Sequence, residues 1–381
     1  MSNTLQTLAD LGENIWRIVI TGGPCSGKTT GLAVLESKLT ERGYKVLVSP
    51  ESATKLMNAG IRPGPKELEG GEFQRLILLD TIGQEDRICQ AAMYYRDKGY
   101  KVVILCDRGT MDGEAYVDPR EFGAMLTQFG YDRRSLCDER YHAVMHLRTA
   151  ALGAPRFYTL ENNATRTETP EQARNIDERT LAAWQRHPHP RVIDNSTDFE
   201  GKVRRLLAEV CTVLGDPLPF EREEKYLVDS SVSIVIPVRV SESIITQTYL
   251  VSSDPREEHR VRSRADNEGT TYYYTRKRYV APGNRVEIER MITKEEHGAL
   301  LAQKDPRSNT IMKRRVCFFW KDRYIEVDFF SEPHQHDGLV LMEIEHTGDT
   351  SQIELPPFLK VIRSVTDEKK YSNAELSRVG T

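Results

Sequence analysis

The stretch Arg17-IVITGGPCSGKTTG-Leu32 decides the fold of the first part of the chain. It joins a short β-branched run to a helical pattern through the spacing Gly22-x-x-x-x-Gly27-Lys28-Thr29. This order of strand, glycine loop and helix is typical of a phosphate-binding loop. Glycines let backbone N–H groups close around an anion, and the start of the helix adds its positive dipole end. We therefore predict an anion site between this strand and this helix.

The residue types of the loop indicate a nucleoside triphosphate bound with a divalent cation. Lys28 is expected to reach the β and γ phosphates, and the Thr29 hydroxyl to ligate Mg²⁺ or Mn²⁺. A chance match in an ordinary strand-to-helix turn is the alternative, and the presence of both flanking elements argues against it. The predicted nucleotide-binding set is completed by Gly22, Gly23, Pro24, Cys25, Ser26, Gly27 and Thr30.

Length and composition indicate a water-soluble chain of two or three domains. The chain has 381 residues, of which 29% are charged, and its mean hydropathy is -0.53. No apolar stretch is long enough to span a bilayer. The six cysteines show no CxxC spacing, which favours reduced thiols in a cytoplasmic protein over a zinc site or disulfides. The net charge of -4 argues against a general nucleic-acid binder.

The first part of the chain, residues 1–215, alternates strand and helix patterns. Buried apolar runs are expected at 45–49, 101–106, 142–147 and 191–193, and an amphipathic closing helix at 202–214. Such alternation predicts an α/β domain with a parallel sheet and helices on both faces. Ligands are then expected beyond the carboxyl ends of the strands.

Acidic residues follow two of these strands. Asp107 ends a buried run, and we predict that it is the Mg²⁺-site carboxylate, with a helix N-cap as the alternative. Arg108 completes an Asp-Arg pair of the kind that nucleoside and nucleotide kinases carry. Glu51 follows the second strand, where it is either a base for an acceptor hydroxyl or simply solvated.

Residues 156–191 are rich in charge and suggest a mobile lid. Arginines of such a lid stabilise the charge that spreads over a transferring phosphate. Arg166 and Arg174 are the preferred candidates for this catalytic role, with Arg179 as a third. A solvent-facing helix that carries arginines is the alternative.

The choice of base stays open between GTP and ATP. Residues 80–85 (DTIGQE) read like a GTPase switch in which Gln84 would orient water, but they also fit a helical periodicity. Asn195, followed by Asp198, resembles a guanine-reading motif without its lysine, so Asn195 is a candidate base contact.

The second part of the chain, residues 221–381, follows a linker at 216–220 and consists mainly of alternating strands. Runs at 230–238 and 241–250 are expected as strands, and charged residues repeatedly occupy every second position of others. We predict a closed antiparallel β-barrel whose inward charged face holds a polyanion and a metal ion. The wet side of an ordinary sheet is the alternative.

The chain resembles known families in both parts. Glu221-R-Glu223-E-Lys225 and the ordered charged strands, over roughly 221–378, resemble the CYTH, or triphosphate tunnel metalloenzyme, superfamily. The first part resembles the P-loop domain shared with NadR-type nucleoside kinases. The two in this order, with PESA at 50–53 and ARNIDERTLAAWQRHP at 173–188, resemble the TRPL-translocation-defect protein family.

The tunnel resemblance implies a set of site residues. The carboxylates that it implies for a metal ion are Glu221, Glu223, Glu343 and Glu345. The cations that it implies for phosphate are Lys225, Arg260, Arg262, Lys277, Lys313 and Arg315.

Three functions remain open from the sequence. The first is a regulator that binds Mg-GTP or Mg-ATP and, in its tunnel, a triphosphate or an anionic phospholipid headgroup, with peripheral membrane contact. The second is a bifunctional enzyme, a small-molecule or nucleoside kinase joined to a triphosphatase. The third is an interaction scaffold with a relict pocket, which the intact Lys28, Thr29 and Asp107 make least attractive.

Overall fold

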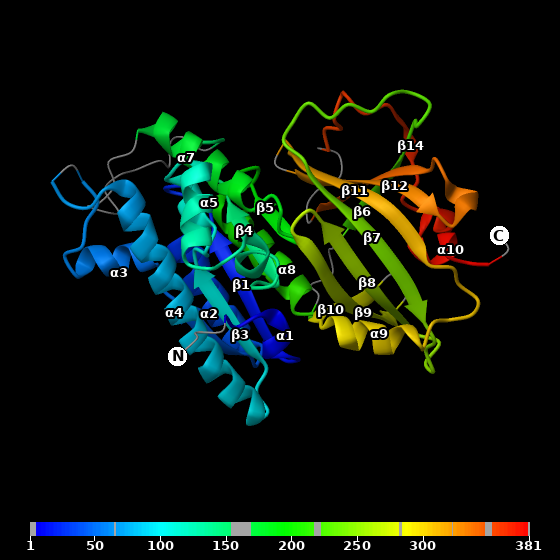
Figure 1. Cartoon of the computed structure of the whole chain (residues 1–381), viewed down its shortest axis with the longest axis horizontal. Helices are drawn as coiled ribbons and strands as arrows, with labels where there is room; N and C mark the ends of the chain where they lie inside the picture. Colours follow the sequence, from blue (N-terminus) through cyan, green and yellow to red (C-terminus); the bar gives the residue numbers. More distant parts are fainter. Residues whose placement is uncertain are drawn as a thin grey trace. The chain divides into compact units, whose positions relative to one another are not determined.

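The computed structural model describes residues 5–64, 66–153, 169–216, 222–281, 284–321, 323–346 and 353–379. The chain divides into two compact units, Met1–Leu207 and Ala208–Thr381, called here the first and the second unit (Figure 1). The predicted linker at 216–220 lies mostly outside the described residues, so its role stays a prediction.

The first unit is built on a five-stranded sheet of order β2-β3-β1-β4-β5, in which every pairing is parallel. This confirms the predicted parallel sheet, and α4 and α8 lie on opposite sides of it in Figure 1. The strands are β1 (Ile15–Thr21), β2 (Lys45–Ser49), β3 (Val102–Asp107), β4 (Ala143–Leu147) and β5 (Pro190–Ile193). The helical segments are α1 (Leu8–Leu11), α2 (Lys28–Glu41), α3 (Ser52–Asn58), α4 (Gly70–Asp97), η1 (Asp112–Ala115), α5 (Pro119–Gln128), α6 (Arg133–Leu136), α7 (Pro170–Ala183) and α8 (Phe199–Val213).

The register of this sheet brings four connections to one edge. The central strands β1 and β4 are buried along their whole length, because helices cover both of their faces. Ile20 pairs with Asp107 and Ser49 with Cys106, so β1, β2 and β3 end at nearly the same level. The loop after β1 therefore lies beside the residues that follow β2, β3 and β4, as expected at the carboxyl ends of parallel strands.

The segment 80–85 lies in the middle of α4, which confirms the helical alternative. Gln84 donates from Nε2 to the Pro50 carbonyl oxygen at 2.6 Å and to Ser52 Oγ at 3.1 Å. Glu85 is fully buried and accepts from Arg140 Nε at 2.7 Å. These side chains fix α4 to its neighbours, because a buried charge pair resists the loss of either member.

The second unit is an antiparallel sheet of order β10-β9-β8-β7-β11-β12-β13-β6-β14. The predicted antiparallel architecture is confirmed. No pairing between β10 and β14 is present among the described residues, so closure into a barrel stays a prediction. The strands are β6 (Arg222–Val228), β7 (Ser241–Leu250), β8 (Glu257–Asp266), β9 (Gly269–Ala281), β10 (Asn284–Ile292), β11 (Ile311–Trp320), β12 (Arg323–Glu332), β13 (Val340–His346) and β14 (Val361–Ser364). The helical segments are α9 (Lys294–Leu301), η3 (His334–His336), η5 (Lys369–Tyr371) and α10 (Asn373–Leu376).

The predicted strand at 230–238 was wrong. These residues form no ladder, although Ile234, Ile236 and Val238 alternate and pack on the apolar core of the second unit. The period of two reflects an extended segment laid on the core, and Pro237 could not donate to a ladder. That core includes Val228, Phe318, Ile325, Val327, Val340, Met342 and Ile344.

No described helix is long and apolar enough to cross a membrane.

Candidate functional site

The loop between β1 and α2 has a backbone that only glycine accommodates at two positions. Gly22 has φ +137° and Gly27 has φ +88°. A Cβ atom at Gly22 would lie 2.0 Å from the Leu147 carbonyl oxygen, and one at Gly27 would lie 2.5 Å from the Phe199 ring. Side chains at either position would push against neighbouring structure, so the loop requires its glycines.

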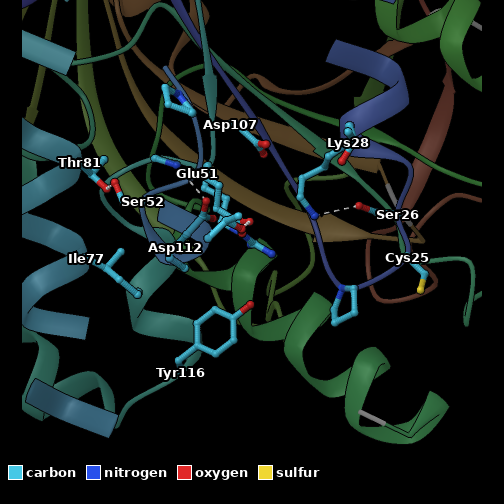
Figure 2. Close-up of a pocket in the computed structure, with 18 of the residues that line it drawn as sticks. Cys25, Ser26, Lys28, Glu51, Ser52, Ile77, Thr81, Asp107, Asp112 and Tyr116 are labelled. Atoms are coloured by element: carbon cyan, nitrogen blue, oxygen red, sulfur yellow. Dashed lines mark hydrogen bonds and ion pairs between the residues drawn. The ribbon is translucent and has the colours of Figure 1, made fainter. Parts of the chain in front are cut away.

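The Lys28 ammonium is buried inside this loop. It donates to the Gly22 and Gly23 carbonyl oxygens at 2.9 and 3.1 Å and to Ser26 Oγ at 3.2 Å (Figure 2). Burial, reinforced by the charge of Arg108, lowers the pKa of Lys28 to about 8. The ammonium is therefore held at the mouth of the loop, where the predicted triphosphate would lie.

Asp107 carries an unsatisfied buried oxygen that fits a metal ion. Its Oδ1 is buried and has no hydrogen-bond partner among the described residues. Burial, helped by the charge of Glu51, raises the pKa of Asp107. Figure 2 shows Asp107 and Lys28 beside the same space, and Thr29 also lines this cavity.

Asp107 and Thr29 together suit Mg²⁺, although no group of three metal-binding His, Cys, Asp or Glu residues is present among the residues that the structure describes. Magnesium at phosphate sites commonly takes one or two carboxylates, a hydroxyl, waters and the phosphate oxygens.

Glu51 is engaged with Arg108 rather than solvated. Its Oε1 accepts from Arg108 Nε at 2.5 Å, and its Oε2 accepts from Thr54 Oγ1 at 2.5 Å. Burial opposes ionisation of Glu51, but the charge of Arg108 and the bond from Thr54 outweigh it and hold the pKa at about 2. A carboxylate with such a low pKa is a weak base at neutral pH.

Asp177, on α7, anchors the loop and was missed by the sequence analysis. Its carboxylate accepts from the Gly23 amide at 2.8 Å, from the Thr149 amide at 3.0 Å and from Arg148 Nη1 at 2.8 Å. His146 Nε2 lies 3.3 Å from it. Burial opposes the charge, but His146 and Arg148 hold the pKa of Asp177 well below its usual range. An acidic residue within a charged helical segment gave no signal of this role beyond its place in the stretch 173–188.

The side chain of Asn195 is occupied by contacts within the fold. Its Nδ2 donates to the carbonyl oxygens of Thr149 at 2.8 Å and Leu152 at 2.5 Å. Its Oδ1 accepts from Lys202 Nζ at 2.7 Å, and Lys202 also donates to Ser26 O at 3.0 Å. Both amide protons are thus used, which leaves none for the edge of a base.

The predicted lid arginines are only partly described. Arg166 lies outside the described residues. Arg174 is exposed on α7 and donates to the Ala151 carbonyl oxygen at 3.3 Å, next to the cavity-lining Ala150. Arg179 instead donates to the carbonyl oxygens of Glu114 and Val117, which ties α7 to η1. Of these three, Arg174 is the one that the described residues place near the loop.

The loop opens into a cavity of about 1400 Å³. One arm of the cavity is lined by Ala150, Asn195, Thr197, Asp198 and Phe199, from the β4 and β5 side. The other arm is lined by side chains of α3, α4 and the segments beside them. This second set includes Met57, Phe73, Gln74, Ile77, Leu78, Thr81 and Tyr116.

The second unit carries a set of buried charges on one face of its sheet. Lys313, which is 2% exposed, forms an ion pair with the fully buried Asp328. Arg315 contacts the same carboxylate at 2.7 Å and Glu343 at 3.2 Å. A solvent-facing sheet surface would not bury charges so completely. This charged face comprises Lys225, Arg260, Arg262, Arg264, Lys313, Arg315, Glu326, Asp328 and Glu343.

Strand pairing extends this face across the sheet. Lys225 lies opposite Glu343 and contacts it at 2.7 Å, and Glu343 lies opposite Glu326. On β8, Arg262 donates to both oxygens of Glu289 at 2.8 Å. Arg260 pairs with Thr275 on β9, which places Lys277 on the same face two residues further.

The remaining predicted carboxylates are only partly described. Glu221 lies outside the described residues, and Glu223 pairs with Glu345 in the ladder of β6 and β13.

One protein-family model matches the sequence of the first unit. Residues 17–202 match the family model described as "AAA domain", so the N-terminal part of the chain contains a P-loop domain of this type. No curated protein matches the chain.

Solved structures with some similarity include the hypothetical protein NE1496, at 25% identity over 41% of this chain and 97% of that chain, with a TM-score of 0.30. A second is the inorganic triphosphatase NE1496, at 24% identity over 41% and 93%, with a TM-score of 0.29. A third is the PH1819 protein from Pyrococcus horikoshii OT3, at 18% identity over 35% and 82%, with a TM-score of 0.28. TM-scores this low carry no conclusion about this chain.

Replacing Asp177 by Asn is expected to destabilise the first unit by about 3 kcal/mol at neutral pH, because it removes the buried one of the two carboxylates, Asp177 and Glu178, that Arg148 contacts. Because folding lowers the pKa of Asp177, its stabilisation is complete above the unfolded pKa near 4 and is lost as the pH falls below it. The difference between wild type and Asp177→Asn should therefore shrink by about 1 kcal/mol between pH 6 and pH 3.

Urea unfolding followed by tryptophan fluorescence measures this difference. Asp97→Asn, at an exposed residue paired with Arg96, is the matched control and should change little. A difference that does not depend on pH would contradict the assigned role of Asp177.

Proposed function

We propose that the first unit binds a Mg²⁺-nucleoside triphosphate, GTP or ATP, at residues 22–30. The observation that carries this proposal is the buried Lys28 ammonium beside the unsatisfied Oδ1 of Asp107, in a loop whose geometry requires glycine. Lys28 exchanges its carbonyl partners for phosphate oxygens, and the loop amides and the start of α2 bind the rest of the anion. Thr29 and Asp107 hold the divalent cation, which supplies charge neutralisation at the phosphates.

A second function, phosphoryl transfer to a small acceptor, is favoured by the cavity arm at α3 and α4. This arm adjoins Glu51 and Arg108 and provides apolar and hydroxyl side chains away from the nucleotide loop. Phosphoryl transfer depends mostly on positioning and charge, so a weakly basic Glu51 still serves if it orients Arg108 and accepts a hydrogen bond from the acceptor hydroxyl. Arg174 is the proposed lid contact to the transferring phosphate, and Arg166 stays a candidate.

For the second unit we propose that the charged face binds a phosphorylated ligand, a triphosphate or an anionic lipid headgroup. The support is the convergence of buried lysine and arginine side chains with carboxylates, a donor set that suits phosphate together with Mg²⁺ or Mn²⁺. From the resemblance to the TRPL-translocation-defect protein family, we also propose a regulatory role in trafficking. The six cysteines, all in the described part of the chain, form no disulfide there, which fits the proposed cytoplasmic location.

Lys28→Ala should abolish binding of Mg-ATP and Mg-GTP, while Lys38→Ala, at an exposed lysine of the same helix, should leave it unchanged. Only the charged ammonium binds phosphate, so the affinity for the nucleotide is highest below pH 8 and falls above it. With a pKa of about 8, Kd should rise about tenfold from pH 7 to pH 9.

Isothermal titration with saturating Mg²⁺ measures this change. Lys28→Arg stays charged and should lose the pH dependence, while Lys202, whose pKa is also about 8, is present in both proteins and cancels in the comparison. Tight nucleotide binding by Lys28→Ala would reject the proposed site.

Glu51→Gln should lower the rate of phosphoryl transfer about a hundredfold, because it misplaces Arg108 beside the reacting phosphate, and should change the nucleotide Kd much less, because Glu51 lies outside residues 22–30. The measurement is transfer of labelled γ-phosphate from Mg-ATP or Mg-GTP to a panel of nucleosides. Glu72→Gln, on α4, is the exposed control. Absence of labelled product from wild type across the panel would reject nucleoside phosphorylation.

Arg262→Gln is expected to weaken binding of inorganic triphosphate at least tenfold, because it removes a charged donor from the charged face. Binding of triphosphate is measured in the Lys28→Ala background with Mg²⁺ or Mn²⁺ present. This substitution prevents binding of triphosphate at the loop of the first unit. Arg256→Gln, at an exposed arginine paired with Asp254, is the control. Liposomes containing phosphatidic acid replace triphosphate to test the headgroup. Equal binding by both variants would exclude the charged face as the site.

A further inference from the structure

The order of strands in the first unit gives the nucleotide loop two different sides. β3 and β2 lie on one side of β1, and β4 and β5 lie on the other. The β3 and β2 side carries Asp107 and Glu51, which face the space beside Lys28 in Figure 2. On the nucleotide-binding function proposed above, this is the side that holds the γ-phosphate. The nucleoside at the opposite end of the triphosphate therefore leaves the loop toward β4 and β5.

The arm of the cavity on that side contains an exposed aromatic residue. Phe199, the first residue of α8, lines the cavity, yet 48% of its surface is exposed. Its ring lies against the backbone of Gly27, where a Cβ atom would be 2.5 Å from it. An exposed phenyl ring costs hydration free energy unless something covers it. Its place beside the loop indicates that a flat ligand group is what covers it.

The donor groups of Asn195 and Lys202 in this arm are already used by the fold. Both amide protons of Asn195 are donated to carbonyl oxygens, as described above. Asp198 accepts from the Gly201 amide through Oδ1 at 2.8 Å, which caps the start of α8. The Lys202 ammonium donates to the carbonyl oxygens of Ser26 and Arg148 and to Asn195 Oδ1. The arm thus offers the nucleoside an aromatic face, while its amide and ammonium donors are engaged within the fold.

We propose that Phe199 is a stacking platform for the base of the bound nucleotide, an inference that rests on the nucleotide-binding function proposed above. Every nucleobase has a π-face, so stacking binds adenine and guanine alike and favours them over the smaller pyrimidines. The base is then recognised by its face, because the Asn195 amide is occupied. We therefore predict Kd values for ATP and GTP within about threefold of each other. The alternative is the sequence-based prediction that Asn195 contacts the base.

The test is displacement of a ribose-labelled fluorescent nucleotide from the full chain in the presence of Mg²⁺. The competitors are ATP, GTP, CTP and ribose 5-triphosphate, which lacks a base. Phe199→Leu preserves apolar packing against Gly27 and removes only the aromatic face. It should weaken ATP and GTP by about fivefold or more, on the scale of base–aromatic stacking, and leave ribose 5-triphosphate unchanged. Tyr94→Leu, at an aromatic residue of α4 that is 59% exposed and outside the cavity lining, should change nothing.

Phe199→Trp supplies a second readout. It should restore purine affinity, and its emission should be quenched by ATP and GTP to a greater extent than that of wild type. Failure of wild type to bind any labelled nucleotide would overturn the nucleotide site itself. Nucleotide binding that Phe199→Leu leaves intact, an equal loss of ribose 5-triphosphate, or a preference above tenfold for one purine would each overturn the stacking platform alone.

Discussion

The first unit depends on one buried carboxylate that holds the nucleotide loop in place. Asp177 reaches from α7 to the Gly23 amide, and the same oxygen accepts from Thr149 in the connection after β4. Arg148 and His146 surround it, so the charge is paired although it is fully buried. Three segments far apart in the sequence thus share one anchor. Loss of one charged partner would leave the other buried without a counter-charge. The position of the loop is therefore coupled to the position of α7.

The architecture was predictable because its signals are local. Continuous apolar runs became the buried parallel strands, and the glycine loop between β1 and α2 follows from its spacing alone. The antiparallel sheet followed from alternating charge. Where prediction failed, at 230–238, the alternation was real, but the segment packs on the core without a ladder partner. Pairing requires a neighbour with a free edge, which a single segment of sequence does not specify.

The candidate site was predictable to the extent that motifs describe backbone geometry. Lys28, Asp107 and Glu51 meet because parallel strands end together. Their electrostatic state was not predictable, since the low pKa of Glu51 arises from its contact with Arg108. Asp177 and the occupied Asn195 amide also escaped prediction, because both contact backbone groups that are distant in the chain. The exposure of Phe199 is likewise a property of the assembled cavity.

The pairing of charges in the second unit has a consequence for how it would take up a ligand. Three cations, Lys225, Lys313 and Arg315, contact three carboxylates, those of Glu326, Asp328 and Glu343, so this cluster is close to neutral. An arriving polyanion must compete with these internal counter-ions instead of entering a positive field. A divalent cation that drew the carboxylates away would release the lysines and arginines for the anion. With the ligand proposed above, each ion would then raise the affinity of the other, which is a heterotropic linkage.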